Sequence, residues 1–237
     1  MKGLRTTNYE LRTDMLEIFS SIQGEGPYVG QRQIFIRFNN CNLNCNFCDV
    51  PKNIKSAKFD VDGVVSKIKK INKKTKHKAV SLTGGEPLLQ TRFLKELLPK
   101  LGKFKFKIYL ETNATLPENL KSILKYIDVI SADIKLPSVT KERPCWREHL
   151  DFIKIASNKN IFVKTIVSKK LKIGDFKKAV SLLRKIDAKV PLVIQPAMNR
   201  KKVLISTNRL HRLQRYALKF LKNVLVIPPT QKIIGVR

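Results

Sequence analysis

From Gln33 onward, short β-rich apolar runs alternate with longer windows in which apolar residues recur at helical spacing. Repeated alternation of this kind is typical of a parallel sheet covered by helices. In the window 174–187, Asp175 lies near the start and an apolar stripe runs from Phe176 to Ile186, as in an amphipathic helix. The predicted strands are Gln33–Phe38, Ala79–Thr83, Phe106–Glu111, Val129–Asp133, Ile161–Val167, Leu192–Gln195 and Val224–Ile227, and the predicted helices lie around 60–74, 91–101, 117–126, 146–158, 174–187 and 206–221.

The number of repeats distinguishes a closed barrel from an open one. A closed barrel of this type needs eight strand–helix units, and the predicted helices are too few. We therefore expect an α/β protein whose parallel strands form an open partial (β/α) barrel with the helices outside. The chain of 237 residues has the length of one domain, 1–237, with a sizeable core.

Polar or glycine-rich residues stand at the carboxyl ends of successive predicted strands. Parallel α/β sheets bind their ligands at this edge, so these residues would line one mouth. In chain order they are the loop from Cys41 to Cys48, Gly84-Gly85-Glu86-Pro87, Glu111-Thr112-Asn113, Asp133-Ile134-Lys135, Lys164-Thr165 and Gln195-Pro196.

The chain is strongly basic, with 48 Lys and Arg against 18 Asp and Glu and a formal net charge of +30. Lysines recur through nearly every predicted helix, which is the distribution expected of solvated faces. We therefore expect a general affinity for polyanions and no specific nucleic-acid partner. The N-terminus lacks an apolar core of signal-peptide length, and no apolar run could span a bilayer, so the sequence predicts a cytoplasmic protein without membrane contact.

Three cysteines, Cys41, Cys45 and Cys48, form a C-x3-C-x2-C pattern. Thiolates on one compact loop can all point at one metal centre, as iron–sulfur ligation requires. Three ligands for a four-iron cluster would leave one iron open to a small molecule. Structural zinc is the main alternative, but zinc sites are closed by four protein ligands, and Cys145 is about a hundred residues away. The odd number and close spacing of the thiols disfavour disulfides, and we expect Cys145 to be a packing residue.

The pentapeptide Thr83-Gly-Gly-Glu-Pro87 follows the next predicted strand. By itself it would indicate only a turn between a strand and a helix. Placed one strand–helix unit after the cysteine loop, it resembles the GGE element of the radical S-adenosylmethionine (SAM) superfamily. The resemblance implies a 4Fe-4S cluster on Cys41, Cys45 and Cys48. It also implies a SAM site formed by Phe47, Cys48, Asp49, Gly84, Gly85, Glu86, Asp133, Ile134, Lys135, Gln195, Pro196, Ala197 and Met198.

A longer series of motifs narrows the resemblance to one branch of that superfamily. The chain reads EIFSSIQGEG up to Gly26, FIR up to Arg37, and then TGGEP, ETN, DIKLPS and the tail TQKIIGVR. In this order the motifs closely resemble the 7-carboxy-7-deazaguanine synthase family, from about Glu17 to the last residue. That family lies on the pathway to the deazaguanine nucleosides of tRNA.

The resemblance implies a lyase that contracts a ring. A reduced cluster would cleave SAM to a 5′-deoxyadenosyl radical, which takes hydrogen from the carboxylate-bearing ring carbon of 6-carboxy-5,6,7,8-tetrahydropterin. The rearranged radical regains hydrogen, SAM is re-formed, and loss of ammonia gives 7-carboxy-7-deazaguanine. The protein would supply orientation and shielding.

The resemblance also assigns the substrate contacts. Arg37 would pair with the substrate carboxylate in the geometry that a guanidinium favours. The N-terminal segment 1–31 would carry the substrate loop, and the C-terminal tail 228–237 would close the site, with the terminal carboxylate of Arg237 reaching the pterin. The substrate residues implied are Ile22, Gln23, Gly24, Arg37, Thr83, Gln231 and Arg237.

Two residues depart from the family pattern. The family usually has Thr or Ser after its Cys-Asp pair, where the hydroxyl meets a magnesium ion, and this chain has Val50. Mg2+ must then be held through Asp49, water or substrate, or it is not needed. The family's common His near the C-terminus is Gln231 here, which can hydrogen-bond a pterin but cannot carry a proton at neutral pH.

Two other functions remain open at this point. A radical SAM activase that takes hydrogen from a glycine of a partner protein would share the cysteine spacing and the GGE turn but would not need QGEG. A non-catalytic, RNA-associated relative is favoured only by the charge and by Val50. For the ring-contracting lyase, the resemblance implies a small-molecule pterin substrate, an external one-electron reductant of the flavodoxin or ferredoxin type and a homodimer, with a product that serves queuosine or archaeosine.

Overall fold

The protein is represented by a computed structural model that describes residues 11–48, 50 and 55–236. Within these residues nine strands form one sheet in the order β11-β8-β7-β6-β5-β4-β2-β1-β3, and the two edge strands do not pair. The seven strands from β2 to β11 are parallel, whereas β1 is antiparallel to both of its neighbours. The strands are β1 (Arg12–Ile22), β2 (Arg32–Phe38), β3 (Ala57–Asp60), β4 (Ala79–Gly84), β5 (Lys107–Thr112), β6 (Val129–Asp133), β7 (Asn160–Val167), β8 (Leu192–Pro196) and β11 (Val224–Val226).

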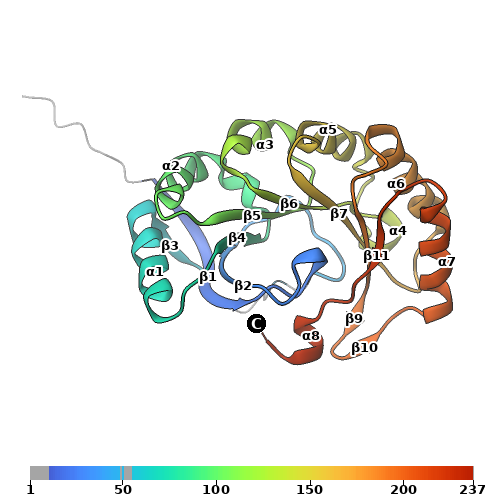
Figure 1. Cartoon of the computed structure of the whole chain (residues 1–237), viewed down its shortest axis with the longest axis horizontal. Helices are drawn as coiled ribbons and strands as arrows, with labels where there is room; N and C mark the ends of the chain where they lie inside the picture. The colour runs from blue at the N-terminus through green and yellow to red at the C-terminus, as the bar shows by residue number, and fades with distance from the viewer. Residues whose placement is uncertain (1–10, 49, 51–54, 237) are drawn as a thin grey trace, which may run out of the picture.

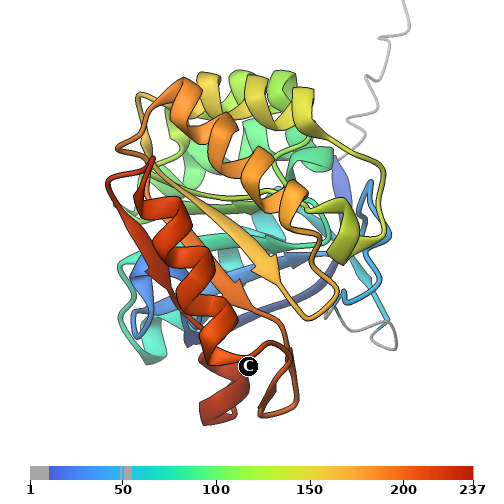
Figure 2. The same ribbon diagram turned by 90° about the vertical axis from the view of Figure 1, so that its right-hand side faces the viewer.

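The main helices cover the outer face of the curved sheet, and the segments after β2 and the C-terminal tail lie on its inner side (Figure 1). A short hairpin, β9 (Met198–Asn199) and β10 (Lys202–Val203), projects beside the tail (Figure 2). The expected open partial barrel is therefore confirmed. The helices are α1 (Val61–Lys74), α2 (Thr91–Gly102), α3 (Pro117–Ile123), α4 (Pro137–Thr140), α5 (Trp146–Ala156), α6 (Ile173–Ile186), α7 (Thr207–Leu218) and α8 (Gln231–Ile234), with 3-10 turns η1 (Gly26–Tyr28), η2 (Pro87–Gln90) and η3 (Leu124–Tyr126).

The main hydrophobic core lies between the sheet and its helices. In α2, buried residues such as Leu94, Leu97 and Leu101 recur at helical spacing and join the same cluster as Leu82 and Leu110 of the strands. Every residue of β6 is buried, as in a parallel strand that is covered on both faces. None of the described helices has the length and apolarity required to cross a membrane.

All seven predicted strands are present, and their boundaries agree to within one residue. The predicted helices are also present, although the one expected over 117–126 is α3 followed by η3, and the one expected over 206–221 ends at Leu218. Strand β1, the short edge strand β3 and the hairpin strands β9 and β10 were not predicted. For β1 the pairing explains the miss. A register shift between Met15 and Glu17 in its pairing with β2 breaks the two-residue periodicity by which a strand is recognised.

A buried histidine of α5 ties two of the loops at the strand ends. The His149 ring is fully buried; its Nε2 accepts from the backbone N–H of Lys135 at 3.2 Å, and its Nδ1 donates to the carbonyl of Ala114 at 3.1 Å. Both bonds can form only when the ring is neutral and carries its proton on Nδ1. Burial is the main cause that lowers the pKa of His149 from 6.5 to about 4, and Lys135 acts in the same direction against Asp133 and Glu148.

We predict that this histidine makes folding pH-dependent. The folded pKa lies below the unfolded one, so its contribution is complete above about pH 6.5 and is lost as the pH falls toward 4, by about 3 kcal/mol. His149→Gln keeps one acceptor and one donor but does not titrate, and should remove this part of the pH dependence. His149→Leu should cost about 1–3 kcal/mol at pH 7.5 for each backbone group left unpaired.

Urea unfolding of the three proteins between pH 7.5 and pH 4.5 measures these differences. Other titrating groups are common to all three proteins, so only the difference between wild type and variant matters. Parallel pH curves for wild type and His149→Gln would show that the pKa of His149 is the same in the folded and unfolded protein, contrary to this assignment.

Candidate active site

One cavity opens at the carboxyl ends of the parallel strands. It brings together side chains from β1, β2, the cysteine loop, β4 to β8 and the C-terminal tail. Most of the residues predicted for the site line it: Cys41, Cys45, Phe47, Cys48, Gly84, Gly85, Asp133, Lys135, Gln195, Pro196, Ala197, Met198, Ile22, Gln23, Gly24, Arg37, Thr83 and Gln231, together with Val50.

Four predicted residues are not part of the described lining. Asp49 and Arg237 lie outside the described residues. Ile134 is fully buried behind the cavity, where its carbonyl accepts from the Thr165 hydroxyl. Glu86 is also fully buried, and its contacts are with the neighbouring loop.

The cysteine loop is held by its neighbours while its thiols remain accessible. Cys41 and Cys48 are exposed, Cys45 is partly exposed, and all three are free thiols. The Asn46 N–H donates to the carbonyl of Thr140 at 2.9 Å, and Asn113 Nδ2 approaches Cys41 Sγ at 3.8 Å. The arrangement fits a cluster with three protein ligands, because three accessible thiols on one loop line the same cavity.

No group of three or more His, Cys, Asp or Glu side chains in the described part of the chain is arranged to hold a single metal ion. Burial raises the pKa of Cys41, and it raises that of Cys45 to about 11 although Lys135 opposes it. Cys41 and Cys45 are therefore protonated at neutral pH, and binding of iron must displace these protons.

The backbone at Gly84 and Gly85 lies so close to the backbone at the end of β2 that only glycine fits at these two positions. Gly84 has φ +110°, and a Cβ there would lie 2.3 Å from the carbonyl oxygen of Phe38; a Cβ on Gly85 would lie 2.1 Å from that of Asn40. The N–H groups of Gly85 and Glu86 donate to these two carbonyls at 2.9 and 2.7 Å. The glycine turn thus fixes the backbone from which the cysteine loop starts.

The Glu86 carboxylate joins this turn to the next loop. It accepts from the Leu88 N–H at 3.0 Å, the Thr112 hydroxyl at 2.8 Å and the Asn113 N–H at 2.7 Å. Burial outweighs these bonds and raises the pKa of Glu86 to about 7. A direct contact between Glu86 and the ammonium group of SAM stays a prediction.

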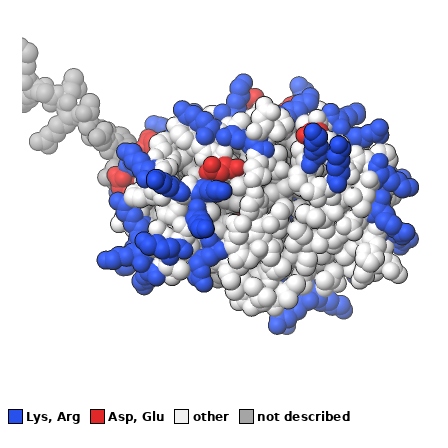
Figure 3. Space-filling view, viewed as in Figure 1, with Lys and Arg blue, Asp and Glu red and all other residues white. Residues whose placement is uncertain are grey.

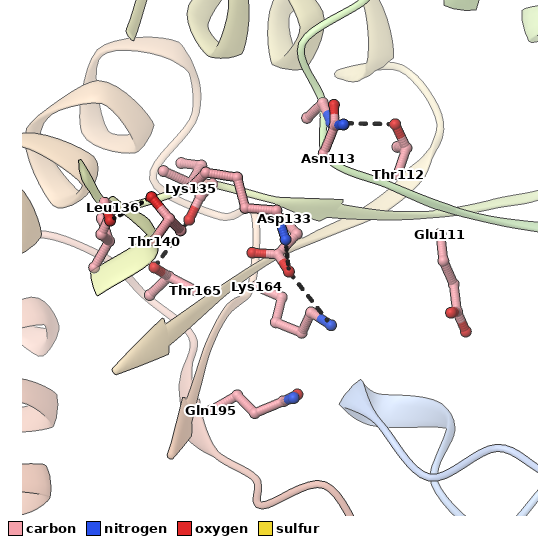
Figure 4. Close-up of polar contacts among 12 residues, drawn as sticks. Glu111, Thr112, Asn113, Asp133, Lys135, Leu136, Thr140, Lys164, Thr165 and Gln195 are labelled. Atoms are coloured by element: carbon pink, nitrogen blue, oxygen red, sulfur yellow. Dashed lines mark hydrogen bonds and ion pairs between the residues drawn. The ribbon is translucent and has the colours of Figure 1, made fainter. Parts of the chain in front are cut away.

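Two lysines and two carboxylates, all partly or fully buried, form a network along the cavity. Figure 4 shows three of them, Lys135, Asp133 and Lys164. Lys164 Nζ pairs with Glu25 and lies 3.6 Å from Asp133 Oδ2, which also accepts from Lys135 Nζ at 2.9 Å. Burial would raise the pKa of Glu25, but the charge of Lys164 and hydrogen bonds outweigh it and lower the pKa to about 2. The same carboxylates outweigh burial at Lys164 and raise its pKa. Glu25 and Lys164 therefore stay ionised.

The C-terminal tail docks on the loop that contains Glu25. The N–H and the hydroxyl of Thr230 both donate to the carbonyl of Gly24 at 2.9 Å. Gln231 Nε2 donates to Glu25 Oε1 at 2.9 Å, and Gln195 Nε2 reaches the same oxygen at 3.1 Å. The tail and β8 thus meet at one carboxylate.

Several buried acceptors in this region have no partner among the described residues. They are Asp133 Oδ1, Gln195 Oε1 and Gln231 Oε1, all from side chains that line the cavity. A buried acceptor without a donor is costly, so this wall is suited to a ligand that brings N–H or O–H groups. SAM, with its ammonium and ribose hydroxyls, has such groups.

Arg37 and Glu111 occupy the part of the cavity nearer to β1. Arg37 Nε donates to Glu17 Oε1 at 2.9 Å, and its guanidinium lies 5.4 Å from the centre of the Phe19 ring. Glu111 accepts from the Thr83 hydroxyl at 2.6 Å and from Gln23 Nε2 at 2.8 Å. Burial, followed by the nearby Glu25 charge, raises the pKa of Glu111.

The sequence did not assign roles to Glu25, Glu111 or Lys164. Glu111 and Lys164 were expected at the mouth as members of the series of polar residues on successive strands. Glu111 is next to the end of β5, whereas Lys164 lies within β7, three residues before its end. Glu25 was visible only as part of a glycine-rich turn, and its partners are more than a hundred residues away, so nothing local indicated a buried ion pair.

Comparison with known proteins agrees with this geometry. The family model described as the radical SAM superfamily matches residues 35–183. The 7-carboxy-7-deazaguanine synthase of Geobacter sulfurreducens is 30% identical over 94% of this chain and 97% of its own length. That of Methanothermobacter thermautotrophicus is 32% identical over 96% of this chain and 99% of its own length.

Two solved structures share the fold. The crystal structure of QueE from Escherichia coli has a TM-score of 0.60 and 16% identity, covering 92% of this chain and 93% of that chain. The structure of TYW1 with a lysine-pyruvate adduct bound has a TM-score of 0.56 and 17% identity, covering 80% and 74%. From its cysteine loop, its family match and its full-length relatives, the chain belongs to the radical SAM superfamily and, within it, to the 7-carboxy-7-deazaguanine synthase family.

Proposed function

We propose that the protein converts 6-carboxy-5,6,7,8-tetrahydropterin into 7-carboxy-7-deazaguanine with loss of ammonia, as a carbon–nitrogen lyase. The observation that carries the proposal is the single cavity, because it unites the three cluster cysteines, the glycine turn and a carboxylate-binding arginine. Full-length relatives named for this synthase support it.

The 4Fe-4S cluster and SAM, when bound, supply the reversible hydrogen abstraction. Cys41, Cys45 and Cys48 would hold the cluster at the outer end of the cavity. The unpartnered oxygens of Asp133 and Gln195 would take the hydrogen-bond donors of SAM. The chain itself then has to orient the two ligands and keep water from the radical.

Arg37 is the proposed partner of the substrate carboxylate. Its Nε is used by Glu17, which fixes the plane of the guanidinium and leaves the two terminal nitrogens as a fork for a carboxylate. Phe19 and Phe35 stack at 5.3 Å beside it and add apolar surface to this side of the cavity.

Glu25 and Glu111 are proposed to receive the N–H edge of the pterin. Each is partly buried at the cavity wall. The Gln23 side chain links them, because its Oε1 accepts from the Glu25 N–H at 3.0 Å and its Nε2 donates to Glu111. Glu25 is held ionised by Lys164, so it accepts hydrogen bonds and does not act as an acid at neutral pH. The tail from Thr230 would close the site over this edge, with Arg237 reaching the substrate.

The remaining parts of the assignment are proposals as well. They are a homodimer in the cytoplasm, a flavodoxin or ferredoxin as electron donor, and a product used for queuosine or archaeosine. Magnesium has no hydroxyl ligand at Val50, which lines the cavity, so we propose that the ion is held by water and substrate if it binds.

The direct test is turnover by the anaerobically reconstituted protein with the tetrahydropterin, SAM and a chemical reductant. We predict formation of 7-carboxy-7-deazaguanine without net consumption of SAM. A Cys45→Ala variant is the matched control, because it keeps the fold but lacks one cluster ligand, and it should form no product. Cleavage of SAM by the intact protein without any product would contradict the proposal and would favour an activase.

Arg37→Lys should weaken binding of the pterin far more than binding of SAM. A single ammonium can pair with Glu17 or with the substrate, but it cannot do both in the geometry of a fork. We expect a loss of about 1.5–3 kcal/mol, roughly 10- to 150-fold, for the pterin. Anaerobic titration calorimetry with each ligand measures the two affinities, and equal losses would place Arg37 outside the substrate site.

Val50→Thr should make turnover depend more strongly on magnesium. Mg2+ prefers octahedral oxygen coordination and keeps water where a protein oxygen is missing, so valine lowers its affinity without preventing binding. Turnover is measured against magnesium concentration, with EDTA as the zero point and Val50→Ala as the control for side-chain size. Coincident curves for wild type and Val50→Thr would mean that the ion is held elsewhere.

A further inference from the structure

The last part of the chain carries positive charge without any negative charge. From Ala188 to the C-terminus there is no Asp or Glu. The same stretch contains eleven basic residues: Lys189, Arg200, Lys201, Lys202, Arg209, Arg212, Arg215, Lys219, Lys222, Lys232 and Arg237. Acid-free stretches also occur elsewhere, such as 63–85 with seven lysines, but none of them is longer than 23 residues, whereas this one covers 50.

Helix α7 differs from the other helices in the kind of basic residue it uses. The chain has 35 Lys and 13 Arg, yet α7 contains three Arg and no Lys. Arginine binds phosphate through two parallel hydrogen bonds and is more weakly hydrated than lysine. Arginine is therefore favoured over lysine at surfaces that bind anions.

The three arginines have different roles. Arg209 donates to the carbonyls of Lys169 and Leu171 at 3.0 and 2.5 Å and so fixes α7 to the loop after β7. Arg212 and Arg215 are exposed and border a surface hollow lined also by Asn208, His211 and Gln214. Within the described residues, neither exposed arginine forms an ion pair with a carboxylate.

The basic surface continues beyond both ends of this helix. At its start a second hollow is lined by Lys169, Arg200 and Lys202 around the β9–β10 hairpin, which lies beside the first turn of α7 (Figure 2). Lys219 and Lys222 are exposed beyond its last turn. Figure 3 shows blue side chains along the edge of the molecule where Figure 1 places α7. The helix alone, with 12 residues, is about 18 Å long, the length of roughly five nucleotides of one duplex strand.

We propose that the outer face of α7, with the β9–β10 hairpin, binds the phosphodiester backbone of a nucleic acid without reading its sequence. The aromatic side chains of α7 and the turn after it are not available to stack on bases, because Tyr216 and Phe220 are partly buried under Lys177 and Arg184. Contacts to phosphate alone are therefore expected. The inference goes beyond the proposed reaction and does not depend on it.

The test compares removal of two charges from α7 with removal of two charges elsewhere. Arg212→Gln with Arg215→Gln is the variant, and Lys70→Gln with Lys73→Gln on α1 is the control with the same net charge. All four side chains are exposed and lie outside the cavity. Binding of a fluorescein-labelled 20-nucleotide RNA hairpin to the holoprotein is followed by anisotropy between 50 and 200 mM KCl, with iron content and unfolding midpoint as checks of the fold.

We expect the α7 variant to lose at least about 10-fold in affinity and to lower the slope of log K against log salt by about 1.8, the value for two phosphates. The α1 control should change affinity less than about threefold. Equal losses in the two variants would mean diffuse attraction to the whole surface and would overturn the proposal.

Two further arms test the ligand chemistry. A variant with Arg212→Lys and Arg215→Lys keeps the charge, so wild-type affinity in that variant would overturn the role given to the guanidinium groups. A DNA hairpin of the same sequence distinguishes the two sources of phosphodiester. Competition by polyglutamate at equal charge that is as strong as competition by unlabelled RNA would identify the occupant as an acidic polypeptide and overturn the assignment to nucleic acid.

Discussion

The contact between the glycine turn and the end of β2 is the constraint on which the rest of the site depends. Two backbones approach so closely at Gly84 and Gly85 that a Cβ at either position would collide with a carbonyl oxygen. The contact fixes the position at which the cysteine loop begins. Glu86 then connects the glycine turn to the loop after β5 through a hydrogen bond from the Asn113 N–H. Asn113 of that loop then reaches back to Cys41. The cluster loop is therefore positioned by three strands although it belongs to one.

The cavity has a polar interior, which suits polar ligands. Ion pairs between neighbouring side chains stabilise the charged groups that line it. Lys164 is buried between Glu25 and Asp133, where the loss of hydration would be costly without both carboxylates. Since Glu25 belongs to the proposed substrate loop and Asp133 to the proposed SAM segment, the same ammonium group touches both halves of the site. Removing it would leave Glu25 without its counter-ion, whereas Asp133 would keep its pairing with Lys135.

Charge is organised differently inside and outside the molecule. Inside, lysines and carboxylates are paired at short distances, so the local net charge is small. Outside, the excess of lysine is spread over the helices, and only α7 and its neighbours combine arginine with a complete absence of acids. The electrostatic field of the outer surface therefore contributes little to the chemistry of the cavity. The outer surface is the part of the molecule that is free for a second role.

The sequence by itself determined the parallel strands, their helices and the cysteine loop, because each rests on a local pattern of two, three or four residues. It also placed Glu111, Asp133 and Lys135 at the mouth, since strand ends share one edge, whereas Arg37 and Thr83 were assigned to the site by resemblance. Only the tertiary structure decided that β1 joins the sheet, that Glu86 turns to the neighbouring loop and that Glu25 pairs with Lys164. These depend on contacts between segments far apart in the chain, where burial and charge, and not local periodicity, select the partner.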